Sequence, residues 1–492
     1  MSVAQRAVRS TTILFVARTA SKLFVLGAFL LQQHTLGARL YGEFSLIVVL
    51  STLSSIVGDL GLQIVYLREA SRDNARMKTY LAAILAAKIP LFVLSLGSLA
   101  LMAAVAGKGP GFMALVLPAF ALQVATSVAN VLRSTFYATG EMRYEAVATM
   151  SEAVILLVGT FLVARAHLGV ADYLWVYALS YAVTCVYAYL VIGRRYFVPS
   201  VHFDPVLARR LLKMALPFAM VFFLNTVYFR IDVVILSFMR GLTEVGYYTA
   251  AYKFLDGLSF VPQTIMNAVF PTLSIVHLEA IASMRKAYTA TIRLLAALAV
   301  PFAVVLGFGA LPILVSLPGG GVYPQSAPAL QILALAIVFM FVNSTFVFGL
   351  GAMDRQMDSV LLSVMSIVVN VALNFILIPI FPRSTGYLGS SWATVITEVF
   401  LLVAGDLMVR RRLEHRLPWG QPLLPIMVSG ALMIGVMGLL SQLNIYFVSI
   451  FAGLIYLGAL YLTGGVSQDE LRTIRTSLGR RLHPVAVDDG GG

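Results

Sequence analysis

The residues of this sequence best able to do chemistry are ionisable side chains placed inside long apolar stretches. Five are basic and lie well inside those stretches: Arg18, Lys22, Lys88, Arg230 and Lys253. Three are acidic: Asp59, Asp232 and Asp256. A charge at mid-membrane depth costs about 2.5–3.5 kcal/mol on insertion scales, so such residues usually face a bundle interior or a cavity. Arg133, Glu152, Arg293 and Asp406 lie nearer segment ends and are expected to extend toward the membrane surface.

The deep basic residues outnumber the deep acidic ones, so full pairing would still leave positive charge. A cavity lined by cations suits an anionic substrate, because arginine contacts phosphate with two hydrogen bonds and lysine acts as a point charge. Arg18 and Lys22 are four residues apart and share one face of a helix. These spacings predict a cationic, anion-binding cavity.

Structural ion pairing is the alternative interpretation of these charges. Lys253 and Asp256 are three residues apart, on one helix face, and could neutralise each other. Arg230 and Asp232 are roughly 200° apart around a helix, so they cannot both face one cavity. One of these two is expected to pair with a neighbouring helix.

A polar stripe runs along one later apolar stretch. Its members fall within about 80° of one another on a helix: Ser359, Ser363, Ser366, Asn370 and Asn374. Small hydroxyls and amides on one face either allow close helix packing with hydrogen bonds between helices or contact a sugar. Asn370 and Asn374 are therefore candidate substrate-binding residues.

The elements that must position these residues are helices that span a membrane. Hydrophobic residues make up 60% of the 492 residues and charged residues only 12%. A hydrocarbon core takes roughly 20 residues of helix, and in lipid such segments can only be helical. Fourteen segments are expected, at residues 12–34, 44–67, 80–106, 113–137, 147–166, 172–193, 214–239, 248–275, 288–311, 327–352, 358–381, 386–409, 422–440 and 445–463.

The loops between these segments alternate between basic and nearly uncharged. Most of the 35 Lys and Arg residues fall in loops on one side. The loops on the other side hold only Arg39, Lys108, Arg165, Arg240 and Arg383. This asymmetry predicts an inner-membrane protein with both termini cytoplasmic. It explains the net charge of +13 better than nucleic-acid binding does, and the clusters Arg194–Arg195 and Arg410–Arg412 are expected to meet anionic lipid headgroups.

Several signatures of enzymes and cofactor sites are absent from the sequence. No GxxxxGK[ST] loop is present, and the six histidines have no metal-ligand spacing. Cys185 is the single cysteine and is expected to serve packing. The longest expected loops, 194–213 and 312–326, are too short to form an external catalytic domain. Any site is expected among the helices, without a resident cofactor or metal.

A weak internal repeat suggests how the helices are grouped. Gly42, in Leu40-Tyr41-Gly42-Glu43-Phe44, stands 204 positions before Gly246, in Glu244-Val245-Gly246-Tyr247-Tyr248. Two parallel repeats related by an axis normal to the membrane can rock against each other and open a central cavity to either side. The expected domains are a first lobe at 1–200, a second at 201–412, two further helices at 413–465 and a cytoplasmic tail at 466–492.

Three groups of residues carry a family resemblance. They are Arg39-Leu40-Tyr41-Gly42-Glu43-Phe44 with Asp59-Leu60-Gly61-Leu62, Arg230-Ile231-Asp232 with residues 244–253, and residues 370–379 with 386–394. Over about residues 10–410 the chain resembles the multidrug/oligosaccharidyl-lipid/polysaccharide exporter superfamily, in its O-antigen-type polysaccharide transporter branch. The resemblance implies two six-helix lobes in a V around a central cavity. It also implies translocation of an undecaprenyl-pyrophosphate-linked oligosaccharide to the outer leaflet, for lipopolysaccharide or another surface polysaccharide.

The expected mechanism follows from this resemblance. Arg18, Lys22, Arg230 and Lys253, with Lys88, would hold the pyrophosphate while the polyprenyl tail stays in lipid. Asp59, Asp232 or Asp256 would couple the change of access to H+ or Na+. The alternatives are a lipid II-type precursor flippase, a drug or cation exporter, a channel, and a non-transporting scaffold. Expected partners are the lipid-linked oligosaccharide, membrane lipids and other polysaccharide assembly proteins.

Overall fold

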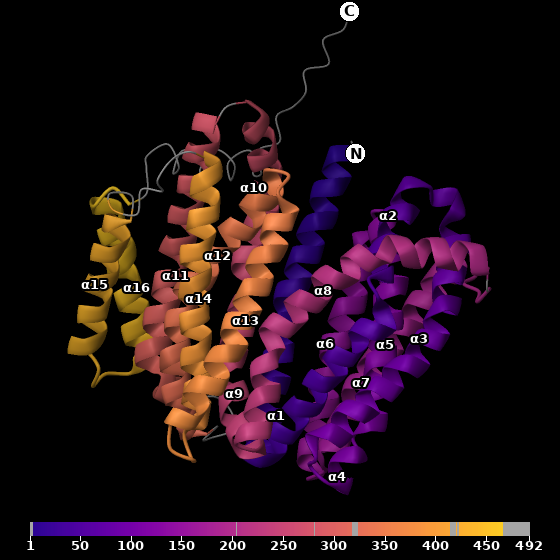
Figure 1. Ribbon diagram of the computed structural model, residues 1–492, viewed down its shortest axis with the longest axis horizontal. Helices are drawn as coiled ribbons and strands as arrows, with labels where there is room; N and C mark the ends of the chain where they lie inside the picture. Colours follow the sequence, from indigo (N-terminus) through magenta and orange to yellow (C-terminus); the bar gives the residue numbers. More distant parts are fainter. Residues whose placement is uncertain are drawn as a thin grey trace, which may run out of the picture. The chain divides into compact units, whose positions relative to one another are not determined.

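The computed structural model describes residues 3–202, 204–279, 281–316, 323–413, 420 and 423–465. All regular structure within these residues is helical, which confirms the all-α class (Figure 1). The elements are α1 (Val3–Asp59), α2 (Leu62–Arg72), η1 (Asn74–Arg76), α3 (Met77–Ala106), α4 (Pro110–Met113), α5 (Val116–Ala138), α6 (Met142–Arg165), α7 (Val170–Arg195), α8 (Pro205–Met239), α9 (Leu242–Leu258), α10 (Phe260–Glu279), α11 (Ile281–Ser316), η2 (Pro324–Ser326), α12 (Ala327–Ala352), α13 (Gln356–Ile380), α14 (Gly386–Leu413), α15 (Leu424–Leu439) and α16 (Ile445–Leu462).

Eleven helices within the described ranges are long and apolar enough to cross a membrane. The protein is therefore a multi-pass membrane protein. The count of fourteen spans stays a prediction, because α1 alone covers much of the first two expected segments and α15 has only 16 residues. The expected tail from residue 466 lies outside the described part of the chain.

The helix α1 is continuous across the loop expected after residue 34. It is 57 residues long and contains one non-helical residue, Gly37, with φ 70° and ψ 165°. Glycine adopts a positive φ at little cost because it has no Cβ atom. The expected loop is thus a kink at a single residue.

The expected segment 44–67 is broken at residue 60. Helix α1 ends at Asp59, and Leu60 and Gly61 follow with φ values of 42° and 72°. A Cβ atom at Gly61 would lie 2.9 Å from the Cβ atom of Phe218 and 3.1 Å from the carbonyl oxygen of Ala215, both in α8. Only glycine fits this position, where the backbone turns directly against another helix.

The expected segment 248–275 is also two helices, α9 and α10, which meet at Ser259. Pro262 lies in the first turn of α10. A proline ring clashes with the carbonyl group four residues earlier and lacks an N–H donor. A straight helix through residue 258 is therefore disfavoured.

The chain divides into two compact units, Met1–Phe254 with Leu314–Leu333 and Val360–Thr397, and Leu255–Ile313 with Ala334–Ser359 and Glu398–Gly492. In the first unit α1 packs mainly against α6 and α3, and α5 against α7. In the second unit α15 packs against α16. The Tyr456 hydroxyl of α16 donates to the Ala297 carbonyl oxygen of α11 at 2.8 Å.

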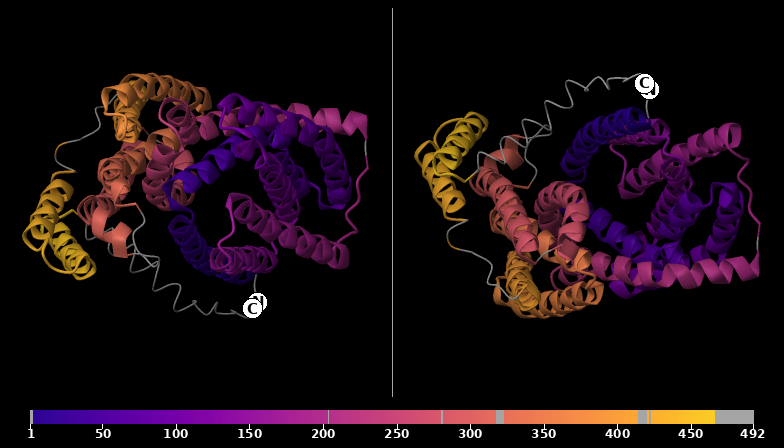
Figure 2. Two further views of the ribbon diagram at one scale, coloured as in Figure 1. Left: turned by 90° about the horizontal axis from the view of Figure 1, so that it is seen from below. Right: turned by 90° about the horizontal axis from the view of Figure 1, so that it is seen from above.

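The first part of α8 runs transverse to α3, α5 and α7 within the first unit (Figures 1 and 2). Asp204 precedes the helix, and its carboxylate accepts from the backbone N–H groups of Val206 at 2.9 Å and Leu207 at 3.0 Å. Leu211 and Ala215 of α8 are buried in a core cluster with Tyr66, Leu81 and Ile192. Pro217 follows inside the helix, where it removes one backbone hydrogen bond and favours a bend.

Candidate functional site

Arg18 and Lys22 are both exposed on α1. One terminal nitrogen of Arg18 donates to the Tyr137 hydroxyl, and the guanidinium carbon lies 5.9 Å from the centroid of the Tyr137 ring. Lys22 forms no ion pair or hydrogen bond with any residue that the structure describes. The pair therefore presents positive charge that is not neutralised locally.

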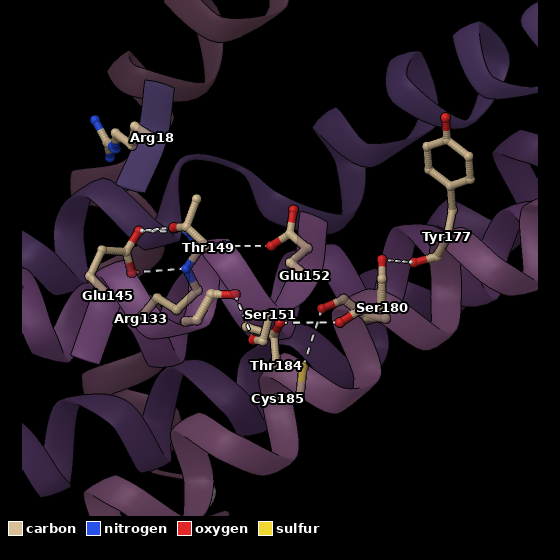
Figure 3. A network of polar contacts seen from close by, with 12 residues as sticks. Arg18, Arg133, Glu145, Thr149, Ser151, Glu152, Tyr177, Ser180, Thr184 and Cys185 are labelled. Atoms are coloured by element: carbon tan, nitrogen blue, oxygen red, sulfur yellow. Dashed lines mark hydrogen bonds and ion pairs between the residues drawn. The ribbon is translucent and has the colours of Figure 1, made fainter. Parts of the chain in front are cut away.

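Behind Arg18 lies a network of buried ion pairs between α5 and α6 (Figure 3). Arg133 donates to Glu145 at 2.9 and 2.5 Å, to Glu152 at 2.9 Å and to the Thr149 hydroxyl at 2.8 Å. The Tyr137 hydroxyl donates to Glu145 at 2.7 Å. Tyr137 thus joins Arg18 to a cation held between two carboxylates.

This network corrects the expectation that Arg133 and Glu152 reach toward the membrane surface. Arg133 is only 12% exposed and is paired with both carboxylates. Sequence reasoning missed Glu145, although Glu145, Thr149 and Glu152 recur at positions i, i+4 and i+7 and so share one helix face. That spacing, beside a single arginine on the preceding helix, was the signal that could have found it.

Lys88 and Asp59 are brought together between α3 and the end of α1. The Lys88 ammonium is 0% exposed and donates to the Asp59 carboxylate and, at 2.6 Å, to the Ser127 hydroxyl. Ser127 also donates to Asp59. Gln123 donates to Ser95 nearby. These contacts favour the structural ion-pair interpretation of Lys88 over direct contact with a substrate.

Asp232 forms a second polar centre, where α8, α9, α13 and α14 meet. One carboxylate oxygen accepts from the Asn374 amide at 2.9 Å, and the other accepts from Tyr248 at 2.8 Å and Thr394 at 3.1 Å. Asp232 is 3% exposed, and the structure gives it no ion pair with a lysine or arginine in the described ranges. Neutral donors alone therefore stabilise this buried carboxylate.

The amides of the predicted polar stripe belong to this centre. Asn374 also donates to the Asn370 backbone oxygen at 3.0 Å, and both residues are buried. The carbonyl oxygen of the Asn374 side chain is buried and has no hydrogen-bond partner among the residues that the structure describes. Ser366 bonds the Leu362 carbonyl oxygen at 2.9 Å. The buried part of the stripe thus serves packing and Asp232, which favours the first of the two interpretations offered for it.

The other three predicted residues lie on α8 and α9. Arg230 and Asp256 are half-buried and Lys253 is exposed, and each takes part in a polar or charged contact. The Lys253 ammonium lies 5.7 Å from the centroid of the Phe29 ring on α1, within the range of a cation–π interaction. Lys253 thus lies near the helix that carries Arg18 and Lys22.

The two repeat-related glycines touch each other across α1 and α9. A Cβ atom added to Gly42 would overlap the carbonyl oxygen of Leu242, and one added to Gly246 would overlap that of Ala38. Ala38 and Leu242 are separated by the same 204 positions as the glycines. The contact is therefore reciprocal, as it is across a two-fold axis. We call residues 38–45 with 242–249 the glycine crossing.

Aromatic side chains surround the glycine crossing. Tyr41 is 1% exposed, and its ring centroid lies 6.4 Å from that of Tyr323. Tyr323 in turn donates to the Gln33 carbonyl oxygen at 2.7 Å. Tyr247 packs between Tyr323 and Tyr387, at 5.9 and 5.5 Å. Tyr41, Tyr247, Tyr323 and Tyr387 thus form one aromatic cluster at the crossing.

One polar group at the crossing lies outside the spans. The Glu244 carboxylate accepts from the backbone N–H group of Tyr387 at 2.9 Å, in the first turn of α14. Burial raises the pKa of Glu244, while this hydrogen bond and the nearby Arg240 act in the opposite direction. Glu244 therefore caps α14 and ties it to α9.

Two family models match the chain. A model described as polysaccharide biosynthesis protein matches residues 7–277, and one described as lipid II flippase MurJ matches residues 194–463. No curated protein matches the chain in sequence.

Several solved structures share the fold. A lipid II flippase MurJ in an inward closed conformation has a TM-score of 0.69 at 15% identity, covering 94% of this chain and 99% of that one. An inward-facing multidrug resistance MATE family transporter has a TM-score of 0.65 at 15% identity, covering 80% and 94%. A MOP superfamily transporter from Pyrococcus furiosus has a TM-score of 0.57 at 17% identity, covering 83% and 95%.

Proposed function

The chain belongs to the multidrug/oligosaccharidyl-lipid/polysaccharide exporter superfamily, in its branch of polysaccharide and lipid-linked flippases, and from this premise we propose that it moves an undecaprenyl-pyrophosphate-linked oligosaccharide from the cytoplasmic to the outer leaflet. Members of this family are transporters and not enzymes. The translocated oligosaccharide would serve the synthesis of a surface polysaccharide such as O-antigen. The proposed location is the inner membrane with both termini cytoplasmic, because the basic loops lie on one side of the predicted spans.

The observation that carries the proposal is the exposed pair Arg18 and Lys22 on α1. Tyr137 holds Arg18 through one nitrogen, and the other N–H groups of Arg18 make no hydrogen bond with a described residue. A guanidinium has five N–H donors in a planar fork that matches phosphate oxygens. Arg18 can therefore stay anchored while it binds a pyrophosphate, with Lys22 adding a second charge one turn later.

The ion-pair network behind Arg18 keeps this charge in place. Tyr137 gives its hydrogen to Glu145, so its oxygen is free to accept from Arg18. Glu145 is only 1% exposed and is fixed by Arg133. A buried and fully bonded network rigidifies the group that it contacts. We assign Lys253, on α9, a supporting role in binding the same anion. We assign the same role to Arg230, whose positive charge also complements the anion.

Lys88 has a different role in this proposal. Its ammonium is fully buried, forms an ion pair with Asp59 and donates to Ser127, so it stabilises the packing of α1, α3 and α5 against one another. Asn370 and Asn374 likewise support Asp232.

Asp232 is the favoured candidate for coupling transport to H+ or Na+. The charge of Asp59 is already balanced by Lys88, whereas Asp232 has only neutral donors. An unpaired carboxylate in a buried site is costly, so a proton or a small cation would stabilise it. Oxygen atoms of Asn370, Asn374 and Thr394 lie in the same cluster and are suitable neighbours for either.

The glycine crossing supports a change of access by rocking. Reciprocal contact between repeat-related residues is expected where two repeats meet about a common axis. Glycine at both positions allows the backbones to touch and separate without interlocking side chains. We propose that the crossing is closed when the substrate site faces the cytoplasm.

A lipid II-type peptidoglycan precursor is the second candidate substrate. The MurJ family model and the MurJ fold match favour it. Both candidates carry a polyprenyl pyrophosphate, so Arg18 and Lys22 would serve either. A cationic drug fits less well beside these basic residues.

Transport can be tested with the purified protein in liposomes that carry a fluorescent lipid-linked oligosaccharide. Exchange between leaflets is expected for the native chain, and Arg18→Ala is expected to lose most of it at equal protein content. Leaflet exchange that is equal in both proteins would overturn the assignment of Arg18. No exchange by either would favour a scaffold, and leak of small ions a channel. Fluorescent lipid II in the same liposomes distinguishes the two substrates.

A further inference from the structure

The first three turns of α8 present two opposite faces with different chemistry. One face is buried: Ala208, Leu211 and Ala215 are 4%, 2% and 0% exposed. Leu211 and Ala215 belong to the core cluster formed with α2, α3, α5 and α7. The burial fixes the rotation of the helix and therefore fixes what the other face displays.

The opposite face is basic and exposed. Val206, Arg209, Arg210 and Lys213 fall within about 100° of one another around the helix, and all four are exposed. The open surface of this first part of α8 is formed by Pro205, Val206, Arg209, Arg210, Lys213 and Met214. This surface thus combines three cations with apolar side chains.

The positive charge of this face is not balanced by the described part of the chain. Arg209, Arg210 and Lys213 have no ion pair or hydrogen bond with any residue there. The nearest acid, Asp204, is engaged by the backbone N–H groups of Val206 and Leu207. Arg194 and Arg195, at the end of α7, add two more cations to the same loop region.

The apolar neighbours indicate the depth of this face in the membrane. Leu216 and Met220 are 58% and 59% exposed, one and two turns beyond Lys213. Val206, before the cations, is 79% exposed. A helix that carries exposed basic and apolar residues together lies in the headgroup region, with the apolar residues in the acyl boundary and the cations at phosphate level.

We propose that the basic face of α8, formed by Arg209, Arg210 and Lys213, binds the phosphate headgroup of an anionic phospholipid. The site is separate from Arg18 and Lys22, which are assigned to the transported pyrophosphate. Three cations near a membrane surface attract anionic lipid, and guanidinium groups give directed contacts to phosphate oxygens.

The test uses the full-length protein purified in a neutral detergent and titrated with phosphatidylglycerol or phosphatidylcholine, with bound lipid read by native mass spectrometry. The native protein is expected to retain phosphatidylglycerol in preference to phosphatidylcholine. R209Q/R210Q is expected to weaken retention of phosphatidylglycerol by roughly thirtyfold, since each of the two lost cations contributes about 1 kcal/mol near an anionic surface. R209K/R210K, which keeps the charge, is expected to retain most of it.

A matched control is R72Q/R76Q, which removes two arginines that are also exposed. These two residues already pair with Glu69 and Asp73 at 3.8 and 3.4 Å, so they are expected to contribute little lipid binding. Equal loss in both double variants, or no loss in R209Q/R210Q, would overturn the proposal. Because all four arginines are exposed, thermal denaturation is expected to be unchanged in each variant.

Discussion

The hydroxyl of Thr249 donates a hydrogen bond of 3.1 Å to the hydroxyl of Ser45, a residue 204 positions earlier in the chain. The same interval separates Gly42 from Gly246. Two positions that correspond by an internal repeat therefore contact each other directly. This self-contact is the observation behind our proposal that the glycine crossing closes during transport.

Adding a methyl group at the glycine crossing tests how closely the backbones of α1 and α9 approach each other there. Gly42→Ala is expected to destabilise the protein by about 1–3 kcal/mol, because the new Cβ atom overlaps the Leu242 carbonyl group. Thermal denaturation in detergent measures the loss, and the liposome assay measures transport. Gly97→Ala in α3 is the control, because its Cβ atom would meet no atom within 4 Å. Similar behaviour of the two variants would argue against close contact at the crossing.

The buried pair Lys88 and Asp59 offers a test of structure against substrate binding. Lys88→Met leaves Asp59 without its cation, and breaking a buried pair in this way costs about 3–5 kcal/mol, less where a partner is partly exposed, as Asp59 is. The double variant D59N/K88M is expected to recover much of that stability. Thermal denaturation of both variants gives the comparison. A Lys88→Met protein that is as stable as the native one, yet inactive, would restore Lys88 as a substrate ligand.

Tyr137 is expected to position Arg18. Tyr137→Phe removes the hydroxyl between Arg18 and Glu145 but leaves Glu145 bonded to Arg133 and Thr149. Loss of a hydrogen bond to a charged group costs about 1.5–3 kcal/mol, so affinity for the lipid-linked oligosaccharide should fall by roughly 10–100-fold. The concentration dependence of transport measures this.

The control for Tyr137→Phe is Tyr196→Phe, whose hydroxyl contacts Thr139 at 3.2 Å and no cation. If both variants keep the native affinity for the lipid-linked oligosaccharide, the hydrogen bond from Arg18 to Tyr137 is not needed for substrate binding.

Replacing Asp232 by Asn removes its charge with little change of shape. Tyr248 and Thr394 are hydroxyl groups that can either donate or accept, so the fold is expected to tolerate the change. Transport should lose its dependence on a proton or sodium gradient, measured by varying each gradient across the liposome membrane. Asp59→Asn is the comparison, and a gradient dependence lost there but kept in Asp232→Asn would move the coupling site to Asp59.

The sequence allowed most of the helical architecture to be predicted, because continuous apolar runs leave few alternatives in lipid. The predictions that differ from the structure concern single residues. Gly37 lies in an expected loop, but its positive φ angle only kinks a helix that continues on both sides. Pro262, which divides the segment 248–275, could have been recognised from its missing N–H group.

The candidate site was harder to predict, because its contacts join distant parts of the chain. Asp232 and Asn374 were proposed for separate roles, and their hydrogen bond spans 142 positions. No periodicity within one helix reveals such a partner. Glu145 was different, since its spacing to Glu152 marked a shared helix face. Lys88 lies inside a long apolar helix, as predicted, but whether its ammonium met water or Asp59 depended on packing between helices.

Cross-linking at the glycine crossing tests the flippase account most directly. The single native cysteine, Cys185, is first replaced by alanine, and S45C/T249C then places two thiols where the native hydroxyls lie 3.1 Å apart. In liposomes with fluorescent lipid-linked oligosaccharide, the oxidised protein is expected to stop leaflet exchange and the reduced protein to resume it. Exchange that continues at the same rate after complete cross-linking would contradict the account.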